Sequence, residues 1–407
     1  MTETYFGLPA EVRFCRQCVI SNQRPSSTVE FRSAAADTKS VIRFDDSNLC
    51  EACRYAEQKD QAIDWRGREE HLLRLLDRFR RTDGGYDVIV PGSGGKDSAF
   101  TAHVLKYKYG MNPLTVTWAP HLYTDIGWRN FQNWIHVGGL DNILFTPNGR
   151  VHRLLTKEAF HNLLHPFQPF IVGQRMIGPK FAARYGVKLV MYGENQAEYG
   201  NRVEENQDPR MRAEFFAVDG AKDVRLGGRP IPELISNHRL RLADFEPYLP
   251  MQVDDTTACG IEVHYLGFYL KWDPQECYYY AVEHTGFQAN PERTEGSYSK
   301  YSSIDDKIDP FHYYTTLIKF GLGRASYDAA QEIRNGKISR EEGVALVRKY
   351  DLEFPQKYFR EFLEYIDTSE ADFHARIDQF RSPHLWERRE SGWQLRHPIW
   401  ASDSDKR

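Results

Sequence analysis

The chain of 407 residues is long enough for two or three domains, and its 41% hydrophobic and 14% aromatic residues exclude a disordered protein. Lys and Arg number 53 against 57 Asp and Glu, so the net charge of −4 excludes general coating of nucleic acid, though not a local basic patch. No apolar run approaches the ~18 residues of a membrane span, and the N-terminus lacks the pattern of a secretory signal. We therefore expect a cytoplasmic protein with no membrane span and no nucleic-acid partner.

Four of the six cysteines form two Cys-x-x-Cys pairs, Cys15 with Cys18 and Cys50 with Cys53. In a reducing compartment such pairs are typical of a metal site, because two intervening residues let both thiolates reach one ion and two pairs complete a tetrahedral zinc site. Redox or disulfide chemistry is the alternative, but a single pair would suffice for it. The pairs predict a zinc-binding module. The two other cysteines are interpreted as ordinary thiols, namely Cys259 and Cys277.

After this module, the leucines of residues 65–82 recur at helical spacing and predict a helix that Gly84 and Gly85 end. From residue 86 to 192, short β-branched runs alternate with helical stretches. Strands are expected over 86–91, 113–119, 142–146 and 187–192, and helices over 98–109, 125–137, 151–165 and 170–185. This alternation predicts an α/β fold with a doubly wound parallel sheet, whose ligands bind beyond the carboxyl ends of the strands.

The sequence pattern of the second half of the chain changes twice. Residues 201–310 are irregular and then dense in Tyr, Trp and charge, whereas the pattern is mainly helical from residue 311 onward. Ser339 and Glu342 have the spacing of a capping box for a helix over 340–350. The predicted regions are a zinc module (1–64), the sheet domain (65–200), an insertion and substrate region (201–310) and a helical C-terminal region (311–407).

The strongest chemical signal lies between the first strand and its helix, in the segment Pro91-Gly-Ser-Gly-Gly-Lys-Asp-Ser98. Its glycines, Gly92, Gly94 and Gly95, let the backbone form a nest of N–H groups at a helix N-terminus, which predicts an anion as ligand. Lys96 adds a point charge, Ser93 and Ser98 add hydroxyl donors, and Asp97 beside phosphate makes sense if it holds Mg²⁺. A Walker loop requires Ser or Thr after the lysine, and a dinucleotide fingerprint requires Gly at position 97, so both fail.

This segment resembles the Ser-Gly-Gly-x-Asp-Ser loop of the ATP pyrophosphatases, the PP-loop superfamily. The resemblance implies that the loop binds the pyrophosphate of ATP together with Mg²⁺, and that a substrate carbonyl oxygen attacks the α-phosphorus. The residues that match this loop are Ser93, Gly94, Gly95, Asp97 and Ser98. The end of the second strand, where that superfamily holds adenosine, carries Thr117, Trp118 and Asp125, although packing explains them equally well.

The two cysteine pairs and stretches such as YGENQAEYGN, YLGFYLKWDPQE and ASYDAAQEIRNGKISREEGVALV resemble the bacterial N-acetyl sugar amidotransferases of surface-polysaccharide biosynthesis. Those enzymes convert an acetamido group of a nucleotide-activated sugar into an acetamidino group. The resemblance implies partner subunits similar to the glutaminase and the cyclase of histidine biosynthesis, which deliver ammonia. Position 2 is Thr, so no N-terminal cysteine nucleophile of a glutaminase is present in this chain.

Further candidate residues for the substrate follow the fourth strand and occupy the aromatic, charged segment after residue 270. They are Glu194, Asn195 and Glu198, and Lys271, Trp272, Arg293, Glu295, Tyr298, Lys300 and Tyr301. Aromatic faces stack on sugar rings and basic groups pair with phosphate or carboxylate, but a solvated surface explains the same residues. Asp305, Asp306 and Lys307 are equally ambiguous, and His312 is either a general acid or base or a packed histidine.

Two other functions are open. A PP-loop tRNA thiolation ligase would need a basic face and a sulfur-carrying cysteine, which the net charge of −4 disfavours. A non-catalytic zinc scaffold that binds nucleotide would have no need of the Asp97 carboxylate. We therefore expect an ATP-dependent amidotransferase with Lys96 and Asp97 as catalytic residues and with ATP, Mg²⁺ and Zn²⁺ as cofactors.

Overall fold

A five-stranded parallel sheet lies at the centre of the protein, as shown by a computed structural model that describes residues 3–35, 37–201, 207–220 and 224–402. Its strands are β1 (Val88–Pro91), β2 (Pro113–Trp118), β3 (Asp141–Phe145), β4 (Leu189–Tyr192) and β9 (Glu262–Tyr265). Their order is β3-β2-β1-β4-β9, and every pair is parallel. The predicted α/β fold with a doubly wound parallel sheet is confirmed.

Both faces of the sheet are covered, which explains the apolar strand sequences. In β1, Ile89 belongs to one core cluster whereas Val88 and Val90 belong to the other, and all three are fully buried. Parallel strands covered on both faces are expected to be continuous apolar runs of this kind. On one face Gly173 and Gly178 bring α6 so close to the sheet that an added Cβ at Gly173 would lie 2.3 Å from the Trp118 ring.

The helices between these strands agree with the sequence analysis to within a few residues. They are α2 (Trp65–Phe79), α3 (Lys96–His103), α4 (Asp125–His136), α5 (Gly149–Leu163) and α6 (Gln168–Tyr185). The helix predicted over 98–109 is α3 followed by a π-helical turn over Val104–Lys108. The fifth strand, β9, was not predicted, and it extends the sheet beyond residue 200. The division into four regions stays a prediction.

The segment between β4 and the C-terminal region contains short elements. These are β5 (Ala217–Val218), β6 (Arg225–Leu226), β7 (Arg229–Pro230), α7 (Ile231–His238), β8 (Met251–Gln252), α8 (Val253–Cys259), α9 (Leu266–Tyr269) and α10 (Pro274–Thr285). The C-terminal region contains α11 (Asp309–Phe320), α12 (Arg324–Arg334), α13 (Arg340–Tyr350), α14 (Phe359–Tyr365), α15 (Glu370–Gln379), the hairpin of β10 (Trp386–Arg389) and β11 (Gly392–Leu395), and α16 (Ile399–Ser402). The predicted capping box is present, since Ser339 and Glu342 exchange hydrogen bonds at the start of α13. Among the described helices, none is both long and apolar enough to cross a membrane.

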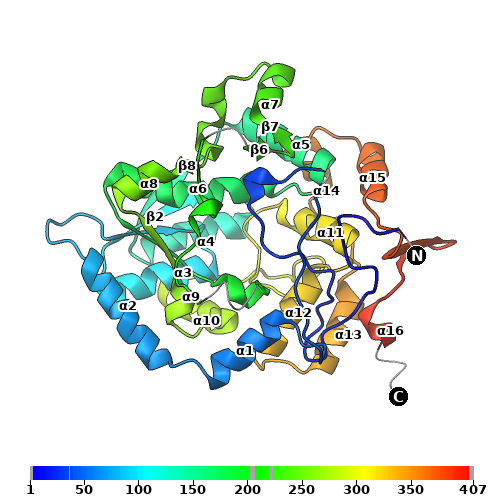
Figure 1. Cartoon of the computed structure of the whole chain (residues 1–407), viewed down its shortest axis with the longest axis horizontal. Helices are drawn as coiled ribbons and strands as arrows, with labels where there is room; N and C mark the ends of the chain where they lie inside the picture. Colours follow the sequence, from blue (N-terminus) through cyan, green and yellow to red (C-terminus); the bar gives the residue numbers. More distant parts are fainter. Residues whose placement is uncertain (1–2, 36, 202–206, 221–223, 403–407) are drawn as a thin grey trace.

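The N-terminal segment lies beside the C-terminal helices (Figure 1). The N-terminal segment, drawn in blue, runs beside α12, α13 and α16 before it enters α1 (Glu51–Gln61). One apolar cluster joins the four paired cysteines to Ala329 and Ala330 of α12, Val347 of α13 and Ile399 of α16. The cysteine-bearing segment is therefore packed onto the C-terminal helices.

Folding stability is expected to fall in acid because of His152 on α5. His152 is buried against Trp118, its Nδ1 lies 2.8 Å from the Tyr248 hydroxyl, and burial followed by the charge of His121 lowers its pKa well below the ordinary value. The unfolded chain therefore binds a proton below about pH 6.5 that the folded chain excludes, so this contribution to stability is complete above pH 6.5 and is lost as the pH falls. Between pH 7.5 and 5.5 the loss is about 1.4 kcal/mol.

Urea titrations at the two pH values test this expectation. The difference in the free energy of unfolding between pH 7.5 and 5.5 should shrink by about 1.4 kcal/mol in His152→Gln. An unchanged difference would show that His152 is not the group that titrates.

Candidate functional site

The sheet order creates a switch point between β1 and β4, because the connections from these neighbouring strands run to opposite sides. Ligands of open parallel sheets bind in the crevice beyond the carboxyl ends of strands at such a point. The glycine-rich loop of residues 92–95 leaves β1 here, and the segment with Glu194 leaves β4. The topology therefore brings together two segments that the sequence analysis selected separately.

Two glycines of the loop, Gly92 and Gly94, have no room for side chains. Gly94 has a φ of +83°, and an added Cβ would lie 2.8 Å from the Phe131 Cα. At Gly92 an added Cβ would lie 2.2 Å from the Ser98 Cβ. Gly95 then caps α3, whose first turn contains Lys96 and Asp97. The loop thus presents backbone N–H groups at a helix N-terminus, which is the arrangement that binds phosphate.

Lys96, Asp97 and Glu194 form a charged cluster beside the loop. The Lys96 Nζ lies 2.6 Å from Asp97 Oδ2, and only 8% of the Lys96 side chain is exposed. Burial by itself lowers the pKa of the Lys96 ammonium, but Asp97 and then Glu194 raise it above its ordinary value, so Lys96 stays charged. Burial and then the charge of Asp97 raise the pKa of Glu194 to about 8. Two carboxyl groups therefore share this position with a single ammonium.

The donor set fits a magnesium ion. Asp97 Oδ1 is buried and has no hydrogen-bond partner in the described part of the chain. Glu194 lines the same cavity as Asp97. Carboxylate oxygens that leave several positions for phosphate and water are the ligands that Mg²⁺ takes in phosphate sites. Asp97 and Glu194 are the residues that would hold the ion.

One cavity, of about 310 Å³, opens at the phosphate-binding side of the loop. Its lining includes Ser93, Gly94, Gly95 and Asp97 on one side and Asp305, Asp306, Asp309 and His312 on the other. We call it the loop cavity. Burial is the main cause that raises the pKa of Asp309 to about 7. The charge of Arg324 lowers this pKa, and the charge of Asp305 raises it further. Asp306 is held by His121, whose Nδ1 lies 2.7 Å from Asp306 Oδ2.

A second cavity, of about 170 Å³, lies beside Lys96, Asp97 and Glu194. We call it the arginine cavity, because its far side carries Arg24, Arg324 and Arg334. Arg324 Nε pairs with Asp328 at 3.0 Å. Arg24 lies over the Tyr327 ring at 4.8 Å, and two guanidinium nitrogens of Arg334 are buried without a hydrogen-bond partner among the described residues. Buried guanidinium groups that lack a carboxylate are suited to an anionic ligand.

The four paired cysteines come together as a candidate metal centre. The Cys15 and Cys53 sulfurs are 3.8 Å apart, as are those of Cys18 and Cys50, and all four lie within 4.8 Å of one another. A tetrahedral ion with metal–sulfur bonds of about 2.3 Å places its sulfurs about 3.8 Å apart. All four cysteines are fully buried. The chain therefore contains a closed four-cysteine cluster with the spacing of a single ion.

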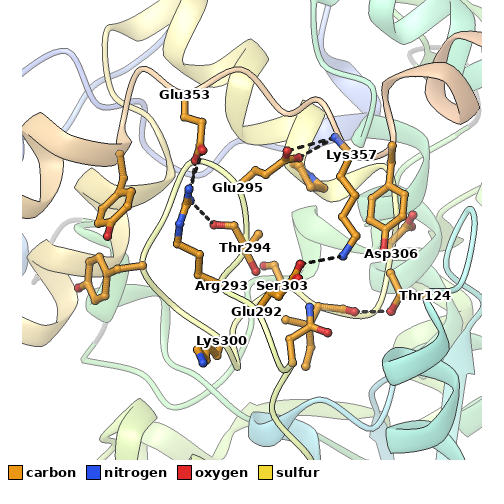
Figure 2. Close-up of a pocket in the computed structure, with 16 residues that line it drawn as sticks. Thr124, Glu292, Arg293, Thr294, Glu295, Lys300, Ser303, Asp306, Glu353 and Lys357 are labelled. Carbon is orange, nitrogen blue, oxygen red and sulfur yellow. Dashed lines mark hydrogen bonds and ion pairs between the residues drawn. The ribbon is translucent and has the colours of Figure 1, made fainter.

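Four of the predicted sugar contacts surround a large cavity, of about 670 Å³ (Figure 2). They are Arg293, Glu295, Tyr298 and Lys300. Most of their polar groups already have protein partners: Arg293 makes a bidentate pair with Glu353 at 2.6 and 2.7 Å, and Glu295 accepts from the Lys357 backbone N–H. Figure 2 shows Lys300 pointing away from these pairs. The four predicted residues therefore line one cavity, whose wall carries charges of both signs that are mostly paired with each other.

Six other predicted positions are not brought to these cavities. Thr117 and Trp118 are interior residues of β2, Asn195 caps the short helix of Gln196–Tyr199, and Trp272 is 1% exposed beneath Gly193. Lys271 pairs with Asp60 on the surface, and Glu198 is buried in an ion pair with Lys59. Contacts of these residues with adenosine or sugar stay predictions that the geometry does not favour.

The Glu198 pair is expected to stabilise the fold. Lys59 Nζ lies 3.1 Å from both Glu198 oxygens and also donates to the Trp272 carbonyl and to Asn335, and both charged side chains are 2% exposed. Lys59→Met should lower the free energy of unfolding by about 3–5 kcal/mol, because it leaves a buried carboxylate without its partner. Lys271→Met, which breaks an exposed pair, should change it by less than about 1 kcal/mol. Equal effects in urea titrations would show that burial of the pair does not matter.

The sequence analysis missed several residues of the site. Arg24, Arg324, Arg334 and Asp309 line the cavities next to the loop, yet the sequence analysis assigned a role to none of them, although Arg334 lies in one of the stretches that carry the family resemblance. Arg24 comes from the N-terminal segment, and the other three come from α11 and α12. No local pattern reports such contacts, because they form only when the two ends of the chain pack together.

Comparisons with known proteins place part of this chain in a family context. Residues 295–398 match the family model described as "LPS biosynthesis protein WbpG-like, C-terminal domain". No curated protein matches the chain in sequence.

Solved structures give weak similarities. An NH3-dependent NAD synthetase from Campylobacter jejuni is 16% identical over 32% of this chain and 56% of its own, with a TM-score of 0.26. An NMN synthetase from Francisella tularensis is 15% identical over 32% of this chain and 54% of its own, with a TM-score of 0.25. A U34-tRNA thiolase from Methanococcus maripaludis, solved with its 4Fe–4S cluster, is 13% identical over 83% of this chain and 89% of its own, with a TM-score of 0.30. This chain thus spans just over half the length of the two synthetases.

Proposed function

We propose that the protein is an ATP-dependent amidotransferase of lipopolysaccharide or O-antigen biosynthesis. Its substrate is the acetamido group of a nucleotide-activated N-acetyl sugar, which it converts to an acetamidino group with release of AMP and pyrophosphate. The observation that carries the proposal is the glycine-rich loop at the switch point, with Asp97 Oδ1 unpartnered beside Glu194. The match of residues 295–398 to the WbpG-like C-terminal domain supports the biosynthetic role.

The proposed reaction has two steps. The acetamido oxygen attacks the α-phosphorus of ATP, the bond to pyrophosphate breaks, and an O-adenylyl imidate forms. Ammonia then attacks the imidate carbon, and AMP leaves with the former acetamido oxygen. Activation of this kind is needed because the oxygen of an amide is a poor leaving group.

The residues of the loop would act on the first step. The N–H groups of residues 93–95 and the ammonium of Lys96 would stabilise the negative charge that develops on the departing pyrophosphate, whereas the Gly92 N–H already donates to the Val116 carbonyl in the sheet. Asp97 and Glu194 would hold Mg²⁺, which would supply further charge neutralisation. Asp309, whose pKa is raised to about 7, avoids adding a full negative charge to the cavity that receives the phosphates.

We assign zinc to the cluster of Cys15, Cys18, Cys50 and Cys53. The support is the sulfur spacing, which fits one tetrahedral ion, and the complete burial, which leaves no open coordination position. Its role is structural, because the cluster joins the N-terminal segment to α12 and α13. The charges of Arg24 and Arg334 interact with the cysteine sulfurs and would offset the negative charge of four thiolates around Zn²⁺.

We propose that ammonia comes from separate proteins, a glutaminase subunit and a cyclase-like subunit that channels ammonia. We further propose that the reaction takes place in the cytoplasm. Nucleic acid is not proposed as a partner, in keeping with the net charge of −4.

The test is pyrophosphate release from ATP and Mg²⁺ by the purified protein. It uses ammonium chloride and a panel of nucleotide-activated acetamido and diacetamido sugars, with products read by mass. We expect AMP and a sugar lighter by about one mass unit, since oxygen is replaced by NH. Release of pyrophosphate only with undermodified tRNA and a sulfur donor would instead establish a thiolation ligase.

A further inference from the structure

A third cavity, of about 370 Å³, lies between the N-terminal segment, α6 and α11. We call it the basic cavity, because four basic side chains line it: Arg24, Lys39, Arg175 and Lys319. Glu30 is the one carboxylate in the described lining. The cavity therefore carries an excess of positive charge in a partly buried space.

The existing contacts do not neutralise these cations. Arg175 Nη1 is buried without a hydrogen-bond partner in the described part of the chain, and Lys319 Nζ donates to a neutral group, the Leu163 carbonyl, at 2.8 Å. Burial and then Lys39 lower the pKa of Lys319 to about 7. Burial would raise the pKa of Glu30, yet His165, Lys39 and Arg175 together lower it to about 2. A single carboxylate thus faces more positive charge than it balances.

The basic cavity adjoins the proposed site of the reaction. It shares Arg24, Tyr199, Tyr313 and Tyr327 with the arginine cavity, and that cavity reaches Asp97 and Glu194. A ligand whose anionic part lies among the four cations therefore extends past tyrosine rings toward the loop. Aromatic faces of this kind suit a sugar ring or a base.

The large cavity of Figure 2 offers a contrast. Its charged lining is Arg293, Lys300 and Lys357 against Glu292, Glu295, Glu353 and Asp306, so carboxylates outnumber cations there. A diphosphate that arrives without a metal ion would meet repulsion in that cavity and attraction in the basic cavity. The charges of the two linings therefore favour a diphosphate in the basic cavity and not in the cavity of Figure 2.

We propose that the basic cavity binds the diphosphate of the nucleotide-activated sugar, so that the acetamido group reaches Asp97 through the arginine cavity. This inference rests on the proposed function for the identity of the substrate. The recognition itself rests on Lys39, Arg175 and Lys319, since guanidinium and ammonium groups form strong, charge-assisted hydrogen bonds with phosphate.

Lys39→Gln and Arg175→Gln test the assignment. Each should raise the KM for the nucleotide-sugar roughly ten- to hundred-fold, as expected for the loss of one charged hydrogen bond, and leave the KM for ATP and the kcat at saturating sugar within about two-fold. Lys108→Gln is the matched control, because it removes an exposed lysine that is paired with Glu69 outside the cavities. Arg175→Lys should recover part of the lost affinity. Thermal unfolding confirms that each variant is folded.

Direct binding separates this inference from the proposed reaction. Calorimetric titration with UDP, GDP and dTDP is performed while a non-hydrolysable ATP analogue saturates the loop cavity. Weaker nucleotide binding in Lys39→Gln and Arg175→Gln, but not in Lys108→Gln, supports the basic cavity even if no sugar is amidated. Unchanged binding in both variants, or weakened binding of tRNA instead, overturns it even if amidation is observed.

Discussion

Asp97→Asn should abolish pyrophosphate release, with a loss of turnover on the order of a thousand-fold or more. The change keeps the shape of the side chain but removes the charge with which Asp97, together with Glu194, would hold Mg²⁺. It also removes the partner that lies 2.6 Å from the Lys96 ammonium. The readout is the rate of pyrophosphate release with ATP, ammonium and the best sugar of the panel.

Asp367→Asn serves as the control for this experiment, because Asp367 is a 92% exposed aspartate that pairs with Lys157 on the surface. Its rate should equal that of the wild-type protein. A rate for Asp97→Asn within about ten-fold of the wild-type rate, in a protein that unfolds normally, would remove Asp97 from the machinery and favour a scaffold that only binds nucleotide.

Cys15→Ser should release the metal and destabilise the whole protein. Because metal binding to such a cluster is coupled to folding, we expect the Tm to fall by more than about 10 °C and the N-terminal segment to detach from α12 and α13. Elemental analysis should find one zinc per wild-type chain and less than about a tenth of that in the variant. Differential scanning calorimetry gives the Tm.

Cys259→Ser is the matched control, since Cys259 is an exposed free thiol. Its Tm and zinc content should be those of the wild-type protein. Iron and inorganic sulfide in place of zinc would refute the assignment of a single ion, and an unchanged Tm in Cys15→Ser would refute the structural role.

The parts of the fold that could be predicted are those with a local signal. The β-branched run of β1, followed at once by glycines and a helix, predicts both a strand and a phosphate loop, and both are present. The two Cys-x-x-Cys pairs likewise predict a cluster that the structure assembles. By contrast β9 has only four residues, of which Glu262 and His264 are polar, so its sequence alone does not indicate a central sheet.

In the candidate site, too, the residues with a local sequence signal could be predicted and the others could not. Glu194 was selected because it follows a strand, and the sheet order brings it to Asp97. Trp118 and Trp272 also follow or end regular segments, but their rings fill the interior beneath Gly173 and Gly193. Periodicity does not distinguish a ring that stacks on a ligand from one that packs against a glycine. Arg24 lies at the site because the four-cysteine cluster packs the N-terminal segment onto the C-terminal helices.

In the proposed reaction the acetamido oxygen attacks ATP, so the fate of that oxygen is the measurement that tests the reaction. The reaction is run with a nucleotide-sugar whose acetamido oxygen is ¹⁸O, and the AMP is analysed by mass spectrometry. The account predicts that each AMP carries one ¹⁸O and that pyrophosphate carries none. Unlabelled AMP formed together with an amidated sugar would contradict it, because the oxygen would then have left without passing through an adenylyl intermediate.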